Sequence, residues 1–315
     1  MESKPLQKVQ VFLSAYNGEK YIQSQVESIL QQEAVDVLLT IRDDGSTDRT
    51  YIILENLSRQ YPKKIQIIKG KNLGYRKSFL SMLEQAEAGV AYFAYADQDD
   101  IWEPEKLKCA ITLLKRKSQS WLYASALKIT DADLNVLSVK SPEKMRQTLG
   151  SFFVRTRLAG CTMVFTRALL EIAVKYDQLE VSHEMAPDHD ALLCMLSMLY
   201  EKDIVLDPRA YILHRRHATT ETSGGRGIKN RIQVESKRIF HRPHSYQYTA
   251  RLLLKEPIDW TKNEQSVGNR SLLEAIAGYD QSIWNEIKLC FNKNICCGVR
   301  VADILIRIKM ILRCY

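Results

Sequence analysis

A predicted buried strand that ends in three closely spaced carboxylates constrains this chain more than any other stretch of its sequence. Residues 91–96 are small and aromatic apolar residues, which is typical of a strand inside a sheet. Asp97, Asp99 and Asp100 follow directly, and the residues from Trp102 to Lys106 are predicted to open a helix. Carboxylates at the carboxyl end of a central strand lie where open α/β sheets bind ligands.

The spacing of Asp97 and Asp99 fits one divalent cation. One residue separates them, so in an extended chain both side chains point the same way. Carboxylate oxygens suit a hard cation, which keeps its remaining coordination positions for phosphates and water. The alternative is a solvated acidic turn that caps the following helix. Asp100 is interpreted as the structural member of the three.

Size and composition indicate an ordinary globular protein. The chain has 315 residues, 45% hydrophobic and 26% charged, which allows one large α/β domain with an appendage or two domains. The seven cysteines form no C-x-x-C pair, so we expect reduced thiols and a cytoplasmic protein. The polar N-terminus predicts no signal peptide, and no apolar run reaches the roughly 20 residues of a membrane span.

The chain is basic, with a formal net charge of +8 at pH 7 and a pI of about 9.0. A basic surface suits nucleic acid, an anionic membrane or a phosphorylated substrate. The aromatic and glycine patterns of RNA-binding modules are absent from the sequence, so we expect no nucleic acid partner.

Predicted strands and helices alternate at short intervals, which indicates an α/β fold with a mostly parallel central sheet and helices on both faces. In the first part of the chain we expect strands at 9–15, 37–42, 65–69 and 91–96, and helices at 19–32, 49–61, 75–87 and 105–116. Further on we expect strands at 121–129, 160–165, 204–206 and 211–213, and helices at 167–176 and 191–201.

The C-terminal part of the chain has a different character. Residues 218–230 are polar and glycine-rich and predict a flexible loop or lid, and the pattern is helical and basic from residue 231. We therefore expect a division into residues 1–225 and a basic helical extension over residues 226–315. The last predicted helix, residues 299–315, has apolar residues on one side and bases elsewhere. That pattern fits a helix on an anionic membrane surface, and equally a helix packed on the domain or in a homodimer.

A second acidic pair follows the second predicted strand. Asp43 and Asp44 can accept hydrogen bonds from a ribose or from a base N–H, as acidic residues do in nucleotide-binding crevices. The alternative is helix capping, which needs only one of the two carboxylates. The sequence contains neither G-x-G-x-x-G nor a P-loop, which argues against a dinucleotide fold and against a P-loop NTPase.

Four motifs in order resemble the family 2 inverting glycosyltransferases of the GT-A fold, in particular bacterial cell-surface polysaccharide rhamnosyltransferases. The motifs are Leu13–Gly18, Asp43–Asp48, Asp97–Asp100 and Asp188–Asp190. The resemblance implies a GT-A domain over residues 1–225 that binds a nucleotide diphosphate sugar together with Mg²⁺ or Mn²⁺. The sequence departs from the family pattern at His214, where a Tyr is usual, and after Asp190, where a Trp is more frequent.

On the donor side, the resemblance implies that Tyr16 lines the nucleotide pocket and that Lys77 lies near the nucleotide or its phosphates. Asp43 and Asp44 would contact the nucleobase and the ribose. Arg215, a basic residue at the end of a predicted strand, would face the diphosphate. The residues assigned to nucleotide-sugar binding are Tyr16, Asp43, Asp44, Lys77, Asp97 and Arg215.

On the chemical side, the resemblance implies that Asp99 and His217 bind the metal and that Asp190 is the catalytic base. The acceptor hydroxyl has a pKa far above neutrality, so it needs a base within hydrogen-bond reach during attack. Asp188 is the second choice for this base. One of Asp188 and Asp190 is expected to cap the helix that follows.

Two rival functions fit the sequence less well than glycosyl transfer. A nucleotidyltransferase usually has a basic glycine-rich loop after its first strand, and residues 15–19 are not basic. A non-catalytic nucleotide-sugar-binding protein would be expected to lose Asp99 or Asp190, and both are present. The resemblance favours dTDP-rhamnose as donor, with UDP-galactose or UDP-glucose as alternatives. It favours a lipid-linked saccharide as acceptor, and hence a cytoplasmic protein in peripheral contact with the inner face of the plasma membrane.

Overall fold

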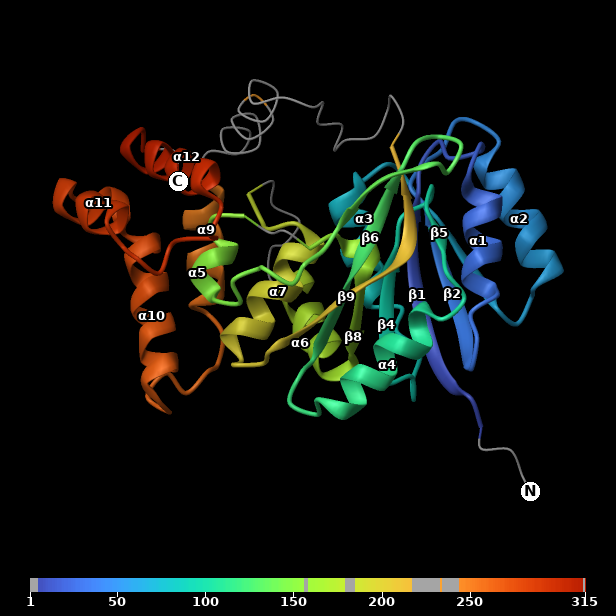
Figure 1. The fold of residues 1–315 in the computed structure, drawn as a ribbon, viewed down its shortest axis with the longest axis horizontal. Helices are drawn as coiled ribbons and strands as arrows, with labels where there is room; N and C mark the ends of the chain where they lie inside the picture. Colours follow the sequence, from blue (N-terminus) through green and yellow to red (C-terminus); the bar gives the residue numbers. More distant parts are fainter. Residues whose placement is uncertain (1–4, 156–157, 179–184, 217–232, 234–243, 314) are drawn as a thin grey trace. The chain divides into compact units, whose positions relative to one another are not determined.

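One mixed sheet organises the first part of the structure (Figure 1). The computed structural model describes residues 5–155, 158–178, 185–216, 233, 244–313 and 315. The strand order is β3-β2-β1-β4-β8-β6-β9-β5, and β7 pairs with β6. The strands are β1 (Gln7–Ala15), β2 (Val35–Asp43), β3 (Ile65–Lys69), β4 (Tyr92–Ala96), β5 (Ile101–Trp102), β6 (Leu122–Thr130), β7 (Val136–Lys140), β8 (Met163–Thr166) and β9 (Ile204–Arg215).

The chain divides into two units, and each is discontinuous in sequence. The first comprises Met1–Lys144, Leu158–Leu179 and Asp203–Thr220. The second comprises Met145–Arg157, Glu180–Lys202 and Glu221–Tyr315. The division predicted at residue 225 stays a prediction, and the predicted loop or lid over residues 218–230 lies outside the described residues.

The predicted α/β class is confirmed in the first unit. The pairs β3–β2, β2–β1 and β1–β4 are parallel, as the alternation of strands and helices predicted. Strand β8 is antiparallel to both β4 and β6, and β5 and β7 are antiparallel to β9 and β6. The sheet is therefore parallel on the β3 side and mixed beyond β4.

Helices cover both faces of this sheet. The helices of the first unit are α1 (Ile22–Leu30), α2 (Thr50–Gln60), α3 (Tyr75–Leu83), α4 (Lys106–Arg116) and α6 (Arg167–Gln178). Alternate residues of β1, such as Val11 and Leu13, pack with α1, α2 and α4 in one aliphatic core. The strands are apolar on both sides, as parallel strands with two covered faces usually are.

Aromatic side chains fill the opposite face of the sheet. Phe12 of β1 stacks on Phe93 of β4 with ring centroids 5.9 Å apart, and Tyr95 lies 5.0 Å from Phe165 of β8. Helix α3 contributes Phe79, whose ring meets Tyr95 edge-on at 5.1 Å. Such aromatic pairs add about 0.5–1.5 kcal/mol each beyond the area that they bury.

Two predicted element boundaries were wrong. The helix predicted at 105–116 forms as α4 from Lys106, but Trp102 does not help to open it, because Ile101 and Trp102 pair with Leu213 and Ile212 as strand β5. Pairing buries Trp102 in the core. The two short strands predicted after residue 203 form one strand, β9, because irregular register against β6 near Ser125 lets the pairing continue.

The second unit consists of helices packed around buried tyrosines. Its helices are α5 (Leu149–Phe152), α7 (His189–Leu199), α9 (Ser245–Leu253), α10 (Glu264–Ala277), α11 (Ile283–Cys290) and α12 (Arg300–Ile311). Tyr315 is fully buried, its hydroxyl donates to the Phe153 carbonyl at 3.1 Å, and its backbone N–H donates to the Tyr279 hydroxyl at 2.9 Å. The ring of Tyr246 lies 4.9 Å from that of Tyr315.

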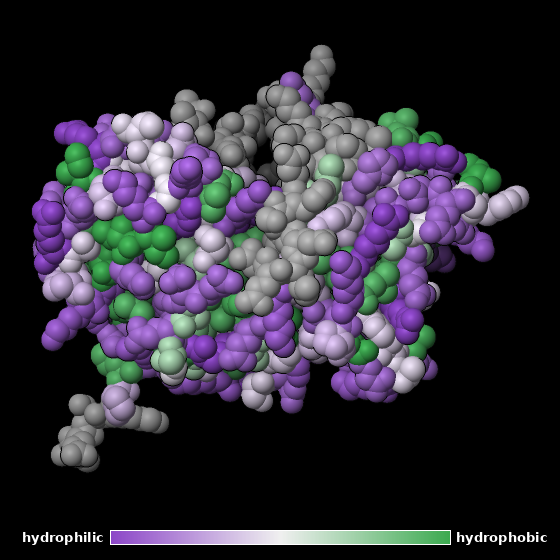
Figure 2. All heavy atoms as spheres, turned by 180° about the vertical axis from the view of Figure 1, so that it is seen from behind, coloured by the Kyte–Doolittle hydropathy of each residue, from purple (hydrophilic) through white to green (hydrophobic). Residues whose placement is uncertain are grey.

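The last two helices of this unit leave large apolar side chains exposed to solvent, and green side chains stand out at the right-hand edge of Figure 2, where these helices lie. Among the described residues, no helix combines the length and the apolar character needed to cross a bilayer.

Two glycines of the second unit test its packing. A Cβ on Gly150 of α5 would lie less than 3 Å from the backbone oxygen of Asn294. We expect Gly150→Ala to lower the free energy of unfolding by about 1–3 kcal/mol, because backbone must move to admit the methyl group. Gly268 of α10 has open space around its Cβ position, so Gly268→Ala should raise stability by about 0.5–1 kcal/mol. Chemical denaturation of both variants checks the pair; equal effects would contradict the packing.

Candidate active site

Parallel pairing brings three loops to one edge of the sheet. Ala15 at the end of β1 lies opposite Asp43 at the end of β2, and Leu13 pairs with Ala96 at the end of β4. The chain runs outward from β1 to β2 and β3 on one side, and β4 lies on the other side of β1. Open α/β sheets bind ligands in the crevice at such a reversal of strand order.

Gln98 joins the acidic loop after β4 to the loop after β1. Its Oε1 accepts from the Tyr16 backbone N–H at 2.8 Å, and its Nε2 donates to the Tyr16 carbonyl at 2.9 Å. A Cβ on Gly18 would lie less than 3 Å from this Gln98 amide, so a larger residue there would displace it. Gln25 of α1 donates to the Asp97 carbonyl at 2.8 Å. These bonds fix the acidic loop and leave the Tyr16 side chain 45% exposed.

The loops after β1 and β2 are joined in the same way. The Asn17 backbone N–H donates to Ser46 Oγ at 3.0 Å, and Asn17 Oδ1 accepts from the Thr47 N–H at 2.8 Å. The Gly18 N–H donates to Thr50 Oγ1 at 2.8 Å. Asn17 has a φ of 48°, a left-handed conformation that asparagine adopts more readily than most residues.

Asp44 is committed to internal hydrogen bonds. Its carboxylate lies 2.6 Å from Arg42 Nη1 and accepts from the backbone N–H groups of Leu73 and Gly74, both at 2.9 Å. Arg42 is also buried and donates to the Lys71 carbonyl at 3.0 Å. The pair therefore holds the segment 71–74 that leads into α3.

Asp43 has a different environment, although it is equally buried. Its Oδ1 accepts a longer hydrogen bond, 3.4 Å, from the Ser46 backbone N–H. A weakly held carboxylate at the end of a central strand is better placed to accept a hydrogen bond from a ligand than one that is already bonded three times. The roles of Asp43 and Asp44 in donor binding stay predictions.

Two carboxylates of the acidic loop lie close to a cysteine and a histidine from other elements. One ligand atom from each of Asp97, Asp100, Cys161 and His214 lies within 4.8 Å of the others. His214 Nδ1 is 2.9 Å from Asp100 Oδ1. Asp100 is fully buried, and in the described part of the chain its Oδ2 has no hydrogen-bond partner. Asp99, the predicted ligand, is partly exposed on the same loop.

The crowding of these groups shifts their pKa values. Burial, with the neighbouring Asp100 and Asp99 carboxylates, raises the pKa of Asp97 to about 7. Burial acts to lower the pKa of His214, but the adjacent Asp100 carboxylate and then Asp97 outweigh it and raise that pKa to about 9. His214 is therefore protonated at neutral pH and offsets part of the negative charge of the loop.

A buried lysine lies in the same region. Lys106 begins α4 and is fully buried, with Nζ 3.5 Å from the centroid of the Trp102 ring. Within the described residues this Nζ has no hydrogen-bond partner. Burial lowers the pKa of Lys106 to about 7, although Cys161 and Asp100 act in the opposite direction. Burial raises the pKa of the Cys161 thiol well above its ordinary range.

The predicted basic residues lie at two element ends. Arg215 ends β9 and is buried, its guanidinium lies 4.8 Å from the centroid of the Tyr21 ring, and its Nη1 donates to the Ala132 carbonyl at 2.6 Å. Lys77 lies half-buried in the first turn of α3. His217, the second predicted metal ligand, lies outside the described residues.

The predicted catalytic base belongs to the second unit. Asp188 occupies the N-cap position of α7, but its side chain makes no capping hydrogen bond. Asp190 lies half-buried in the first turn, where its Oδ1 accepts from the Ala191 N–H at 2.7 Å. Burial lowers the pKa of the intervening His189 to about 4, which fits a neutral structural histidine. The base assignment stays a prediction.

Sequence reasoning missed the partners of the acidic loop. Gln98 and Arg42 adjoin carboxylates in the sequence, but nothing local shows which groups they bond, and Cys161 and Lys106 reach the acidic loop only through the fold. Lys106 resembled a solvated lysine at the start of an amphipathic helix. The one available signal was His214, which departs from the family pattern and pairs with Asp100.

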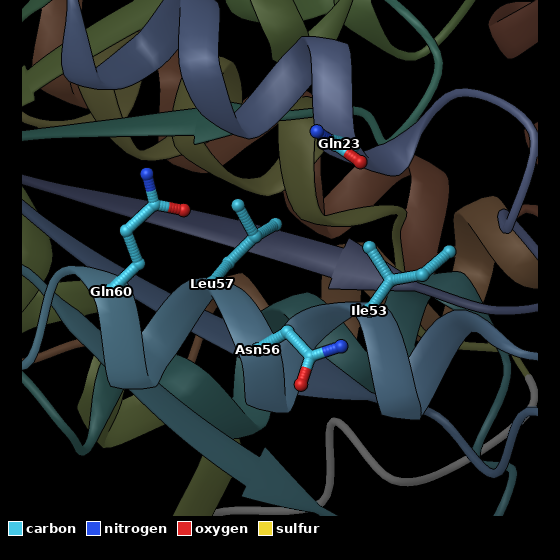
Figure 3. A pocket seen from close by; sticks show the side chains of 5 residues that line it. All are labelled: Gln23, Ile53, Asn56, Leu57 and Gln60. Carbon is cyan, nitrogen blue, oxygen red and sulfur yellow. The ribbon is translucent and has the colours of Figure 1, made fainter.

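A small hollow lies away from this edge, between α1 and α2 (Figure 3). It is lined by Gln23, Ile53, Asn56, Leu57 and Gln60. Because none of these side chains carries a charge, the hollow lacks the groups that a nucleotide diphosphate requires, and it does not coincide with the predicted donor site.

Asp44 can be tested as a structural carboxylate. We expect Asp44→Asn to lower the free energy of unfolding by about 3–5 kcal/mol, because it leaves the buried Arg42 charge without its partner. Asp36→Asn is the matched control. Asp36 lies on β2 and forms a partly exposed ion pair with Lys64, so its loss should cost less than about 1 kcal/mol. Urea denaturation measures both; similar small losses would contradict the structural role.

Lys106 predicts a pH dependence of stability. Its pKa is about 7 in the folded protein and 10.5 ordinarily, so between these values the unfolded chain binds a proton that the folded protein does not. The free energy of unfolding of the wild type should therefore rise, relative to Lys106→Met, as the pH increases from about 7 towards 10.5. Denaturation at several pH values measures this, and Lys108→Met, on the exposed side of α4, should give a flat difference. A flat difference for Lys106→Met as well would contradict the buried, neutral amine.

Comparisons with known proteins agree with this architecture. Residues 10–171, just over half of the chain, match the family model of glycosyl transferase family 2. The chain is 26% identical over 224 residues to the dTDP-rhamnosyl transferase RfbG of Shigella flexneri, which covers 69% of this chain and 75% of that protein.

Two solved structures share the fold. The crystal structure of S. aureus TarS residues 1–349 in complex with UDP-GlcNAc superimposes with a TM-score of 0.57 at 18% identity, covering 98% of this chain and 82% of that one. The mannosyltransferase PcManGT of Pyrobaculum calidifontis, in complex with GDP-Man and Mn²⁺, gives a TM-score of 0.56 at 13% identity, covering 98% and 87%. Sequence family, fold and the carboxylate-bearing edge of the sheet together show that the chain belongs to glycosyl transferase family 2 and is an enzyme of nucleotide-sugar transfer with a GT-A fold.

Proposed function

We propose that this enzyme transfers a rhamnosyl residue from dTDP-rhamnose to a hydroxyl group of a lipid-linked saccharide, with inversion at the anomeric carbon. The product would enter bacterial cell-wall or capsular polysaccharide. The choice of sugar is carried by the similarity to a dTDP-rhamnosyl transferase over 224 residues. The alternative donor is a UDP-hexose, galactose or glucose, and the fold shared with a UDP-GlcNAc-bound enzyme keeps this alternative open.

Donor binding is assigned to the edge of the sheet where β1, β2 and β4 end. Asp43 would accept hydrogen bonds from the base or ribose, and Asp44 would contribute by holding the segment 71–74. The exposed ring of Tyr16 would line the nucleotide pocket, and Asp97 would face the ribose. Lys77 and Arg215 would supply positive charge for the phosphates.

Asp99 and His217 are the proposed ligands of Mg²⁺ or Mn²⁺. The acidic loop fits a cation, because it brings the carboxylates of Asp97 and Asp100 together and leaves Asp100 Oδ2 without a hydrogen-bond partner in the described residues. When bound, a divalent cation would neutralise the charge that develops on the diphosphate leaving group. Arg215 would add a fixed positive charge for the same group.

Asp190 is the proposed catalytic base, with Asp188 as the second choice. Asp190 would take the proton of the acceptor hydroxyl as the hydroxyl oxygen bonds to the anomeric carbon. The bond from that carbon to the diphosphate oxygen would break on the opposite face, so one displacement inverts the configuration.

We further propose a GT-A domain over residues 1–225 and a basic helical extension over residues 226–315, in a cytoplasmic protein that contacts the membrane peripherally. The basic composition supports this placement, because a lipid-linked acceptor lies in a surface rich in anionic headgroups. A homodimer is the alternative use of the extension. We propose no nucleic acid partner.

Thermal shift with nucleotide sugars tests the donor. We expect dTDP-rhamnose with Mn²⁺ to raise the Tm more than UDP-galactose or UDP-glucose, because a ligand of the folded state adds about 2.7 kcal/mol at 100 times its Kd. EDTA should abolish both the shift and sugar transfer. A larger shift with a UDP-hexose would favour the alternative donor, and full transfer in EDTA would contradict the metal assignment.

Asp190→Asn tests the base. The substitution should lower kcat by about 10²–10⁴-fold, because the acceptor hydroxyl loses its base, while the thermal shift with donor and Mn²⁺ stays unchanged. Asp188→Asn is the matched control at the N-cap of α7 and should keep most of the activity. If turnover were lost in the Asp188 variant instead, the two roles would be exchanged.

A further inference from the structure

We propose that helices α11 and α12 together form a surface that lies flat on an anionic lipid bilayer. The α11–α12 surface is defined by the exposed apolar side chains of these helices and the bases around them. Its biological role rests on the proposed lipid-linked acceptor, whereas its physical basis lies in the second unit alone.

Helix α11 exposes unusually large apolar side chains. Trp284 is 69% exposed and Phe291, just after the helix, is 81% exposed. Ile283 and Ile287 are also exposed and follow the same helical stripe as Phe291, with a spacing of four residues. The other side of α11 is already packed, since Leu289 is buried in the unit. Trp and Phe on the apolar side of a short helix are typical of segments that lie at the membrane interface.

Helix α12 is apolar on two sides. Ala302, Ile306 and Met310 are buried and hold the helix on its unit. Ile304 and Ile311, on another side of the helix, are 60% and 63% exposed. Val301 and Ile308 continue this exposed stripe. A helix that only packs on its domain would carry polar residues on its outer side, so packing accounts for one side and leaves the other to be explained.

The two helices form one surface because specific bonds hold them side by side, as Figure 1 also shows. Arg313, just after α12, pairs with the buried Glu286 of α11 at 3.0 Å. Arg307 of α12 donates to the carbonyls of Asn292 and Ile295 in the connection between the helices, at 3.1 and 2.7 Å. The exposed apolar stripes therefore belong to one structural element.

The outward-facing charge of this element is positive. Residues 283–313 contain six basic and two acidic residues. Both acids are used internally, Glu286 by Arg313 and Asp303 by the backbone N–H of Cys297 at 2.7 Å. Lys288, Lys293 and Arg300 are exposed, and none of the three forms an ion pair with another described residue. Each basic residue near an anionic bilayer contributes about 1 kcal/mol to binding.

The length of α12 and the positive charge of the α11–α12 surface together favour a membrane surface as the binding partner. The 12 residues of α12 span about 18 Å, less than the roughly 30 Å of a hydrocarbon core, so the helix can lie in the interface but not cross it. In a symmetric dimer through this surface, the same unpaired bases of both copies would meet, and like charges repel. Anionic headgroups instead complement the bases while the apolar side chains enter the bilayer.

Vesicle binding of the full chain tests this proposal. We expect the wild type to co-sediment with phosphatidylcholine vesicles that contain phosphatidylglycerol, and to bind less at high salt or without the anionic lipid. Trp284→Ser with Phe291→Ser should weaken binding by about tenfold or more, because the two largest apolar contacts are lost. Val136→Ser with Val139→Ser is the control: these β7 residues are exposed apolar side chains of the first unit, 54% and 59% exposed, and binding should not change.

Two further measurements separate this inference from the proposed function. Transfer to a soluble acceptor should be equal in the wild type and the Trp284/Phe291 variant, because neither side chain belongs to the catalytic machinery. Light scattering should show the same mass for both proteins. Equal vesicle binding by both proteins would overturn the proposal, and so would a dimer that the double variant dissolves. Loss of transfer in the wild type itself would count against the proposed function instead.

Discussion

Parallel hydrogen bonding of β1 with β2 on one side and with β4 on the other is the constraint on which the first unit depends. It places the carboxyl ends of three strands at one edge, with Asp43 beside Ala15 and Ala96 beside Leu13. Aliphatic residues and helices cover one face of these strands, and stacked aromatic rings cover the other. Because apolar side chains cover both faces of these strands, the carboxylates that follow the strands lie at the edge of the sheet where the strands end.

Carboxylates gathered at one edge repel one another, and the loops that carry them need to be held in place. The surrounding side chains offset part of the charge and fix the loops. Gln98 fixes the acidic loop through the Tyr16 backbone, and Arg42 neutralises Asp44. His214 is held protonated against Asp100. The acidic loop carries three carboxylic acids beside the single His214 imidazolium, a balance that the proposed divalent cation would complement.

The second unit is organised around buried tyrosines and has no sheet among its described residues. It buries tyrosines between helices and completes their hydrogen bonds to backbone groups, as Tyr315 does with Phe153 and Tyr279. Helix α12 then contributes apolar residues both to this core and to the outer surface. The outer residues stay exposed beside this packed interior, and an anionic bilayer is the partner proposed for them.

The sequence by itself determined the α/β class, the succession of strands and helices up to β4, and the acidic residues at two strand ends, because each depends on local periodicity and on residues adjacent in the chain. It also gave the family resemblance that the family model and the fold confirm. Only the tertiary structure decided that Trp102 belongs to a strand, that Asp44 is occupied by Arg42 and the segment 71–74, and that Cys161, His214 and Lys106 surround the acidic loop. These features depend on contacts between residues more than 25 positions apart or on burial, and neither leaves a periodic trace in the sequence.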